Sequence, residues 1–175
     1  DNESFIGGHV ISQSSADPVS EVNSIIDSIG ITGSPLERGL IESYEATSSG
    51  GDASNTGTFM RSDAKFVVIY ISDEPDVSSR YSSMLPSDYS NHLRGLKASS
   101  SLVVAHAVAG DYPSGCSGSG TYASFGDGYY DVVQDLGGTF LSICSTDWGF
   151  QMDALARASM AVQSFNLSDV PVEDT

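Results

Sequence analysis

The stretch that decides the fold is Lys65-Phe66-Val67-Val68-Ile69-Tyr70-Ile71-Ser72-Asp73-Glu74-Pro75-Asp76. Residues 66–71 form a continuous apolar and largely β-branched run, which is typical of a parallel strand covered on both faces. The run leads directly into three carboxylates within four positions, 73–76. We therefore predict a central strand of a parallel sheet that ends in an acidic loop.

The segments on either side predict alternating strands and helices. We expect a short strand around residues 9–12, helices over 18–29 and 35–47, an exposed loop over 48–55, helices over 86–97, 129–136 and 148–163, and strands over 101–109 and 139–144. Asp17 and Asp147 are the expected N-caps of two of these helices, and Ser34 begins a capping box for a third. With right-handed crossovers, this order predicts an α/β fold with a doubly wound, mostly parallel sheet that has helices on both faces.

Ligands of such sheets bind at the carboxyl ends of the strands. That rule directs the search for function to residues 72–79, 110–122 and 144–149. In the first of these segments, Asp73, Glu74 and Asp76 repel one another unless a cation or backbone amides compensate their charge. Oxygen coordination of Mg²⁺, Mn²⁺ or Ca²⁺ is one interpretation, and an acidic turn that caps the next helix is the other.

Composition excludes several classes of partner. The 175 residues include 23 acidic and 7 basic side chains, and the formal net charge is −16. Scattered lysines and arginines argue against nucleic acid binding, and the same charge argues against an anionic membrane surface. No apolar run approaches the roughly 20 residues of a membrane-spanning helix, so we expect no membrane insertion. The opening Asp1-Asn2-Glu3-Ser4 is the start expected of a processed chain or an excerpt, and the Ser, Gly, Asp and Thr content favours a secreted protein.

Several motifs together resemble a von Willebrand factor A-type domain of the bacterial secreted or lipoprotein branch. They are Phe59-Met60-Arg61-Ser62-Asp63-Ala64, the apolar run, Ser72-Asp73-Glu74-Pro75-Asp76-Val77-Ser78, the Gly-Ser-Pro-Leu-Glu-Arg-Gly-Leu of residues 33–40, Cys116, and Gly137-Gly138 ahead of residues 142–148. The resemblance covers roughly residues 5–170 in consistent order. It implies one domain over residues 1–170, with residues 171–175 leading toward a following domain.

In that family, a metal-ion-dependent adhesion site takes ligands from three loops. They are a DxSxS sequence after the first strand, a Thr or Ser before a helix, and an Asp that ends the fourth strand. Ser34 matches the second element and Asp73 the third, and Asp76 is a further candidate ligand; Ser34 is equally well explained as a plain N-cap. Residues 52–56 have nearly the DxSxS spelling, but they follow a helix rather than an apolar strand, so we regard them as a chance match.

The missing DxSxS element implies that the first strand, which lies beside residues 66–71 in the family, is not part of this chain. A central strand cannot be removed without exposing backbone hydrogen-bonding groups and an apolar face. We therefore expect that the chain is not a complete autonomous fold. The missing strands would come from an N-terminal fragment of the same precursor, from a neighbouring subunit, or from residues not included in this sequence.

Other residues suggest a disulfide and a binding surface. Cys116 and Cys144 follow adjacent predicted strands at one sheet edge, which makes a disulfide and an oxidising compartment plausible; two separate buried thiols are the alternative. Tyr112 and Trp148 lie in loops at the same edge and, with Glu74, are candidates for a recognition surface. We expect His106 to be a hydrogen-bonded core residue, because it lies inside a buried strand.

The function that these features predict is an extracellular or bacterial cell-surface binding module of the von Willebrand factor A type. It would engage a protein or glycan, through a divalent cation in the metal-dependent version. The alternative is a structural subunit of an extracellular filament or assembly, completed by strands from a second chain and without a functional metal site. We do not expect an enzyme, because no nucleophile or general base has a supporting partner and residues 115–120 fail the Gly-x-Ser-x-Gly register.

Overall fold

The protein is a mixed α/β fold built around a three-stranded parallel sheet. A computed structural model describes residues 11–12, 14–29, 36–55, 59–118 and 121–160. The sheet contains β1 (Phe66–Ser72), β2 (Val103–Ala109) and β5 (Phe140–Ser142) in the order β1-β2-β5. A separate antiparallel hairpin joins β3 (Cys116–Gly118) to β4 (Thr121–Ala123).

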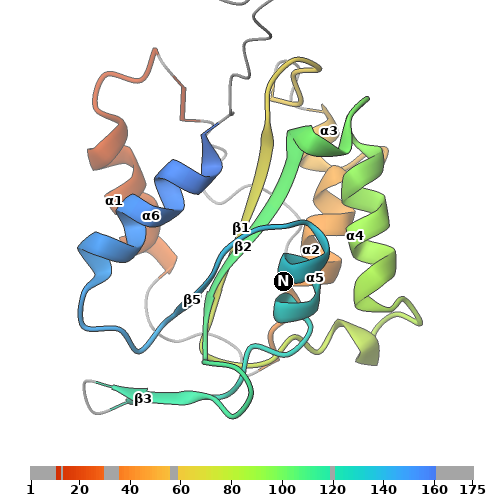
Figure 1. Ribbon diagram of the computed structural model, residues 1–175. Coiled ribbons are helices and arrows are strands. Elements are labelled where there is room, and N and C mark those ends of the chain that lie inside the picture. The colour runs from red at the N-terminus through yellow and green to blue at the C-terminus, as the bar shows by residue number, and fades with distance from the viewer. Residues whose placement is uncertain (1–10, 13, 30–35, 56–58, 119–120, 161–175) are drawn as a thin grey trace, which may run out of the picture.

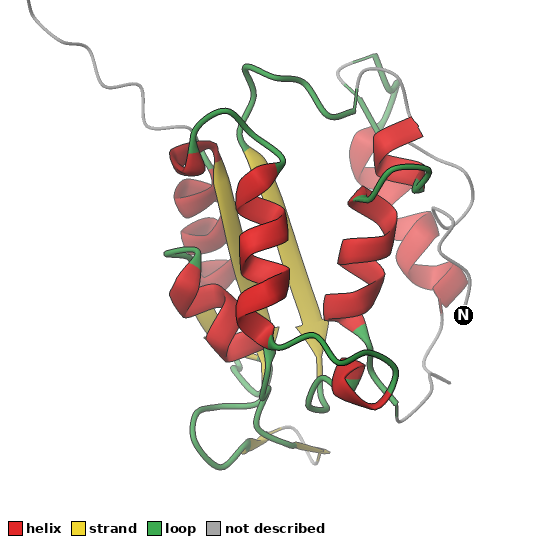
Figure 2. Cartoon of the chain, turned by 90° about the vertical axis from the view of Figure 1, so that its right-hand side faces the viewer, coloured by secondary structure: helices red, strands yellow, loops and turns green. Residues whose placement is uncertain are grey.

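Helices lie on both sides of this sheet. They are α1 (Pro18–Ile29), α2 (Gly39–Thr47), α3 (Asp52–Asn55), α4 (Pro86–Gly95), α5 (Tyr129–Asp135) and α6 (Trp148–Ser159), with short 3-10 helices η2 (Ser78–Arg80) and η3 (Ser100–Leu102). Figure 1 shows α2, α4 and α5 on one side of the sheet and α1 and α6 on the other, and Figure 2 looks onto the first of these layers. In the part of the chain that the structure describes, no helix has the length and apolar character needed to cross a bilayer.

The hydrophobic core lies between the sheet and the layer of α2, α4 and α5. Its buried members are Leu40, Ile41, Tyr70, Tyr89, Leu93, Val103, Ala105, Ala107, Tyr129, Val132, Val133 and Leu136. Alternate residues of a strand point to opposite faces, so Val103, Ala105 and Ala107 of β2 all reach this core. All seven residues of β2 are buried, which makes β2 the central strand of the sheet.

The prediction for β1 is only half right. Residues 66–72 do form a parallel strand, and it pairs with β2 from Phe66↔Val103 to Ser72↔Ala109. The expected burial on both faces is wrong, because β1 lies at the edge of the sheet as described and pairs there with β2 alone. Two isoleucines on one face of β1 are consequently exposed.

The caps of two helices confirm the predicted starts. The Asp17 carboxylate accepts a hydrogen bond from the Ser20 backbone N–H, with a nitrogen–oxygen distance of 3.0 Å, at the start of α1. The Asp147 carboxylate accepts one from the Phe150 N–H, also at 3.0 Å, at the start of α6. Both interactions are local, which explains why the sequence pattern was sufficient to predict them.

The predicted start of α2 is wrong. The helix begins at Gly39 rather than at residue 35, and residues 34 and 35 lie outside the described part of the chain. Glu37 instead forms a parallel β-bridge with Asp76 and lies outside the helix. Asp76 also supplies an acceptor to the Leu40 N–H, so the helix takes its cap from a loop that lies 36 positions along the chain.

Three further predictions need correction. For the strand expected around residues 9–12, positions 9 and 10 lie outside the described residues, and positions 11 and 12 belong to no strand. The loop expected over residues 48–55 contains α3, and Ala53 in that helix is buried. The hairpin of β3 and β4 was not predicted, because strands of three residues rich in Ser and Gly carry almost no periodic signal.

Candidate binding site

The carboxyl edge of the sheet brings together the loops that sequence analysis selected. The last residues of β1 and β2, Ser72 and Ala109, are register partners, so the loops that follow them start side by side. The Asp73 carbonyl accepts a hydrogen bond from the Ser124 N–H at 2.9 Å, and Gly110 forms a bridge with Phe125. The loop after β1, the loop after β2 and the segment after β4 therefore form one continuous edge.

Acidic side chains from two separate segments meet at this edge. Asp73 is exposed, and the Glu74 carboxylate accepts a hydrogen bond from the Ser124 hydroxyl at 3.1 Å. Glu37 lies near the same edge because it forms a β-bridge with Asp76. Partial burial raises the pKa of the Glu37 carboxyl, and the negative charges of Asp73, Glu74 and Asp76 raise it further. The edge therefore carries a negative potential that favours a cation or a basic group.

Asp76 has a structural role within this group. One of its carboxylate oxygens accepts hydrogen bonds from the Leu40 N–H at 3.1 Å and the Ser78 hydroxyl at 3.0 Å. Its other oxygen accepts one from the Ser78 N–H at 2.9 Å. The negative charge also lies at the positive end of the α2 dipole. These contacts match the helix-capping interpretation of the acidic loop, because Asp76 binds the first residue of η2, the next helix in the chain, and also the start of α2.

The predicted metal ligands are only partly brought together. Ser34 lies outside the described residues, and Asp73 presents an exposed carboxylate, which has suitable chemistry for a hard divalent cation. Asp76 already accepts three hydrogen bonds, which hold its carboxylate toward α2 and Ser78. Among the residues that the structure describes, no group of three or more His, Cys, Asp or Glu side chains is arranged to hold a metal ion.

The predicted disulfide is present and anchors the hairpin to the sheet. Cys116 in β3 is bonded to Cys144, which follows β5, across a separation of 28 residues. The Ile143 N–H next to it donates to the Ala109 carbonyl at 2.9 Å, so this region is also tied to the end of β2. In the loop-entropy model, closing a loop of this length contributes roughly 3 to 4 kcal/mol to stability.

An aromatic cluster stiffens the loop after β2. The Tyr112 ring stacks on Tyr130 with a centroid distance of 4.6 Å and meets the Phe125 ring edge-on at 5.4 Å. The side chain of Tyr112 nevertheless remains 61% exposed. Ser124 binds Glu74, and the next residue, Phe125, packs against Tyr112. Two of the three predicted surface residues, Glu74 and Tyr112, therefore contact neighbouring positions of the chain. Trp148, the third, is the first residue of α6 and is 39% exposed.

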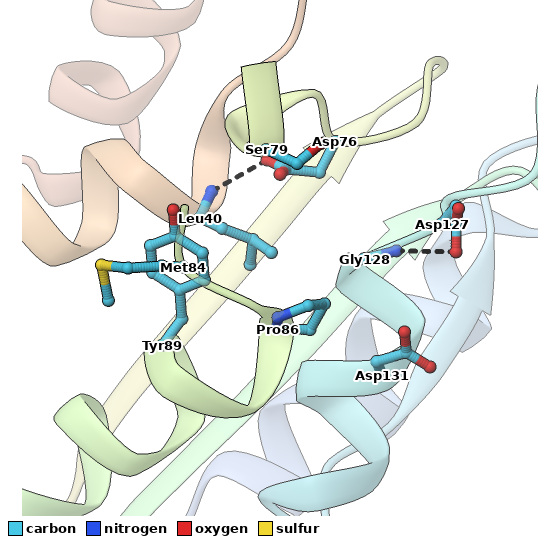
Figure 3. A pocket seen from close by; sticks show the side chains of 9 residues that line it. All are labelled: Leu40, Asp76, Ser79, Met84, Pro86, Tyr89, Asp127, Gly128 and Asp131. Carbon is cyan, nitrogen blue, oxygen red and sulfur yellow. Dashed lines mark hydrogen bonds between the residues drawn. The ribbon is translucent and has the colours of Figure 1, made fainter. Parts of the chain in front are cut away.

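Sequence analysis did not predict the small pocket that lies beside this edge. Its volume is about 210 Å³, and it is lined by Leu40, Asp76, Ser79, Met84, Pro86, Tyr89, Asp127, Gly128 and Asp131. Figure 3 shows Leu40, Met84 and Tyr89 on one side and Asp127 and Asp131 on the other. The Tyr89 hydroxyl is buried and has no hydrogen-bond partner within the described residues. The lining residues come from the starts of α2, α4 and α5 and from the segment between β1 and α4, which only the tertiary fold brings together.

The histidine prediction is confirmed. His106 is completely buried in β2, and its Nδ1 accepts a hydrogen bond from the Thr139 N–H at 2.9 Å. Burial lowers the pKa of this imidazole, and the positive charge of Lys65 lowers it further. His106 is therefore a neutral core residue at physiological pH, and it does not face a solvent-filled cleft as a general base would.

Comparisons with known proteins leave this geometry as the basis for assigning a function. No family model, no curated protein and no solved structure matches the chain.

Proposed function

We propose that the chain is a von Willebrand factor A-like binding module, extracellular or on a cell surface, that engages a protein or glycan at the carboxyl edge of its sheet. One observation carries the proposal. The end of β1 places Asp73 and Glu74 next to the segment that packs against the exposed ring of Tyr112. A charged group beside a stiff, exposed aromatic ring is a combination that recognises polar ligands.

The proposed architecture is the doubly wound sheet of that family. The parallel order β1-β2-β5 and the helices on either side support it. The position of Asp73 supports it as well, because the family's metal-binding Asp ends a strand at the same edge. The disulfide between Cys116 and Cys144 supports the extracellular location, since such bonds persist in oxidising compartments.

A divalent cation, Mg²⁺, Mn²⁺ or Ca²⁺, is part of the proposal. The mutual repulsion of Glu37, Asp73 and Glu74 favours a cation at the edge, and Asp73 has the exposed carboxylate to hold it. When bound, the cation would offer an open coordination position to an acidic group of the ligand. Asp76 would orient the loop by capping α2.

Isothermal titration calorimetry with Mg²⁺ and Mn²⁺ tests the cation. We expect binding to the wild-type chain and its loss in Asp73→Ala. The matched control is Asp63→Ala, which removes another exposed carboxylate just ahead of β1, at the opposite end of that strand. Equal heats for wild type and Asp73→Ala would remove Asp73 from the site, and binding lost equally in Asp63→Ala would reduce the effect to general charge.

A second candidate function is a structural subunit that is completed by a strand from another chain. The observation that favours it is the one-sided pairing of β1 in the described part of the chain, with Ile69 and Ile71 exposed. Light scattering on the eluate of a size-exclusion column over a range of concentrations tests self-assembly. Growth in mass with concentration would favour this function, and a constant monomer mass would contradict a homomeric assembly.

A further inference from the structure

We infer that the outer edge of β1 accepts an extended apolar strand from a different polypeptide of neutral or basic charge. The inference rests on the second candidate function and names both the surface and the kind of partner. The β1 acceptor surface consists of the outer backbone edge of Phe66–Ser72 together with the side chains of Ile69 and Ile71.

The backbone of β1 is prepared for a second neighbour. Its seven residues pair with β2 in one uninterrupted parallel register, and no strand borders its other edge within the described residues. Because backbone groups of a strand alternate in direction, every second residue presents its N–H and C=O to that outer edge. Exposed edges are normally protected by charged residues, prolines or bulges, and residues 66–71 contain none of these.

The exposure of the side chains shows that one face of the sheet is covered over β2 but not over β1. Ile71 and Val108 are register partners in neighbouring strands and point to the same face of the sheet. Val108 is 0% exposed, whereas Ile71 is 64% exposed. Ile69 is 44% exposed, and its partner His106 is fully buried. Parallel sheets are normally covered on both faces, so one further strand with its covering layer would give β1 the environment that β2 has.

The helix layer on this side has unused apolar surface as well. Val19, Val22 and Ile26 recur at helical spacing on α1 and are 70%, 42% and 58% exposed. Figure 1 places α1 on the same side of the sheet as α6. No residue from Pro18 to Ser28 is buried, although the helix is amphipathic. An amphipathic helix is stabilised mainly by packing its apolar face, so these exposed side chains of α1 are available to a partner.

Charge selects a different polypeptide over a second copy. Each copy carries a formal net charge of −16, and Asp73 and Glu74 directly follow β1. Two copies paired through this edge would bring two chains of net charge −16 into contact, which opposes association. A matching strand is therefore neutral or basic, carries apolar residues at every second position to cover Ile69 and Ile71, and spans the seven residues of β1.

Hydrogen–deuterium exchange of the full chain tests the inference. The probe is a capped peptide of alternating valine and threonine with a lysine at each end. The control peptide has proline in place of every second valine, which removes backbone donors from the ladder. The protein variants are Ile69→Lys/Ile71→Lys and, as a matched control, Leu85→Lys, whose side chain is 63% exposed on another part of the surface. Ile71→Thr is a milder variant in case the double variant does not fold.

We expect the probe to slow exchange within Phe66–Ser72 by up to about tenfold, the ratio that corresponds to one backbone hydrogen bond of ordinary net strength. The effect should persist in Leu85→Lys, weaken in Ile71→Thr, and disappear in the double lysine variant and with the proline peptide. Lack of slowing in the wild type would overturn the inference. So would outer-edge amides of β1, those that do not face β2, that are already protected in a monomer without peptide or in a dimer of this chain.

The experiment separates this inference from the function on which it rests. A chain that assembles while the outer-edge amides of β1 remain unprotected, with or without the probe, refutes the acceptor surface and leaves the subunit function in place. A monomer in which the outer-edge amides of β1 are protected only by the probe supports the acceptor surface and removes the homomeric assembly.

Discussion

Replacing Asp76 by alanine removes the acceptor of three hydrogen bonds, one from α2 and two from Ser78 in the loop after β1. The Leu40 N–H loses its helix cap, and the Ser78 N–H and hydroxyl lose their common carboxylate. A lost N-cap costs typically about 1 kcal/mol, and each hydrogen bond to a charged group contributes about 1.5 kcal/mol or more. Because Leu40 and Ser78 are buried, water replaces the lost acceptor poorly. We expect Asp76→Ala to lower the free energy of unfolding by about 2 to 4 kcal/mol.

Urea denaturation followed by far-UV circular dichroism measures this loss, without any divalent cation and in the presence of a chelator. Asp73→Ala is the control, because its carboxylate is exposed and exposed positions usually change stability by less than about 0.5 kcal/mol. Equal stability of wild type and Asp76→Ala would refute the capping role. A larger loss in Asp73→Ala than in Asp76→Ala would show that the two carboxylates have been assigned the wrong way round.

Three further predictions concern charge and covalent structure. Burial lowers the pKa values of His92 and His106 in the folded protein. The unfolded chain therefore binds more protons than the folded protein below about pH 6.5, and stability should fall as the pH decreases from there. Thermal melts from pH 8 to pH 5 that show no decline in melting temperature would contradict this prediction. The pKa of Glu37 is raised in the folded protein, so its ionisation destabilises the fold as the pH rises. Glu37→Gln should therefore raise the melting temperature at pH 7 but not near pH 4. The opposite pH dependence would show that the charge of Glu37 is compensated. Reducing the Cys116–Cys144 bond should cost roughly 3 to 4 kcal/mol, and identical urea midpoints with and without reductant would show that the bond does not constrain the unfolded chain.

Elements whose signals are local could be predicted from the sequence. The apolar run of residues 66–71 specifies β1, and Asp17 and Asp147 mark the starts of α1 and α6 through contacts within three residues. The disulfide was accessible to the same reasoning, because it requires only that both cysteines follow strands which end at one edge. In each case the deciding interaction joins residues close in sequence or relies on a general rule of parallel sheets.

Features that depend on distant contacts could not be predicted in this way. The start of α2 is set by Asp76, and the pocket beside it is lined by the starts of three helices and by the segment between β1 and α4. The hairpin of β3 and β4 is too short and too rich in small residues to show a period. For the binding site, the sequence placed Asp73, Glu74 and Tyr112 at one edge, but their connection through Ser124 and Phe125 comes from the fold.

The sequence by itself determined the α/β class, most of the helices and strands, and the acidic loop after β1, because hydrophobic period and capping residues act over a few positions. Only the tertiary structure decided that β2 is the buried centre and β1 the exposed edge, and that Asp76 caps a helix. The physical reason is that residues 66–71 and 103–109 have the same apolar character, and burial depends on what packs beside a strand as well as on the strand itself.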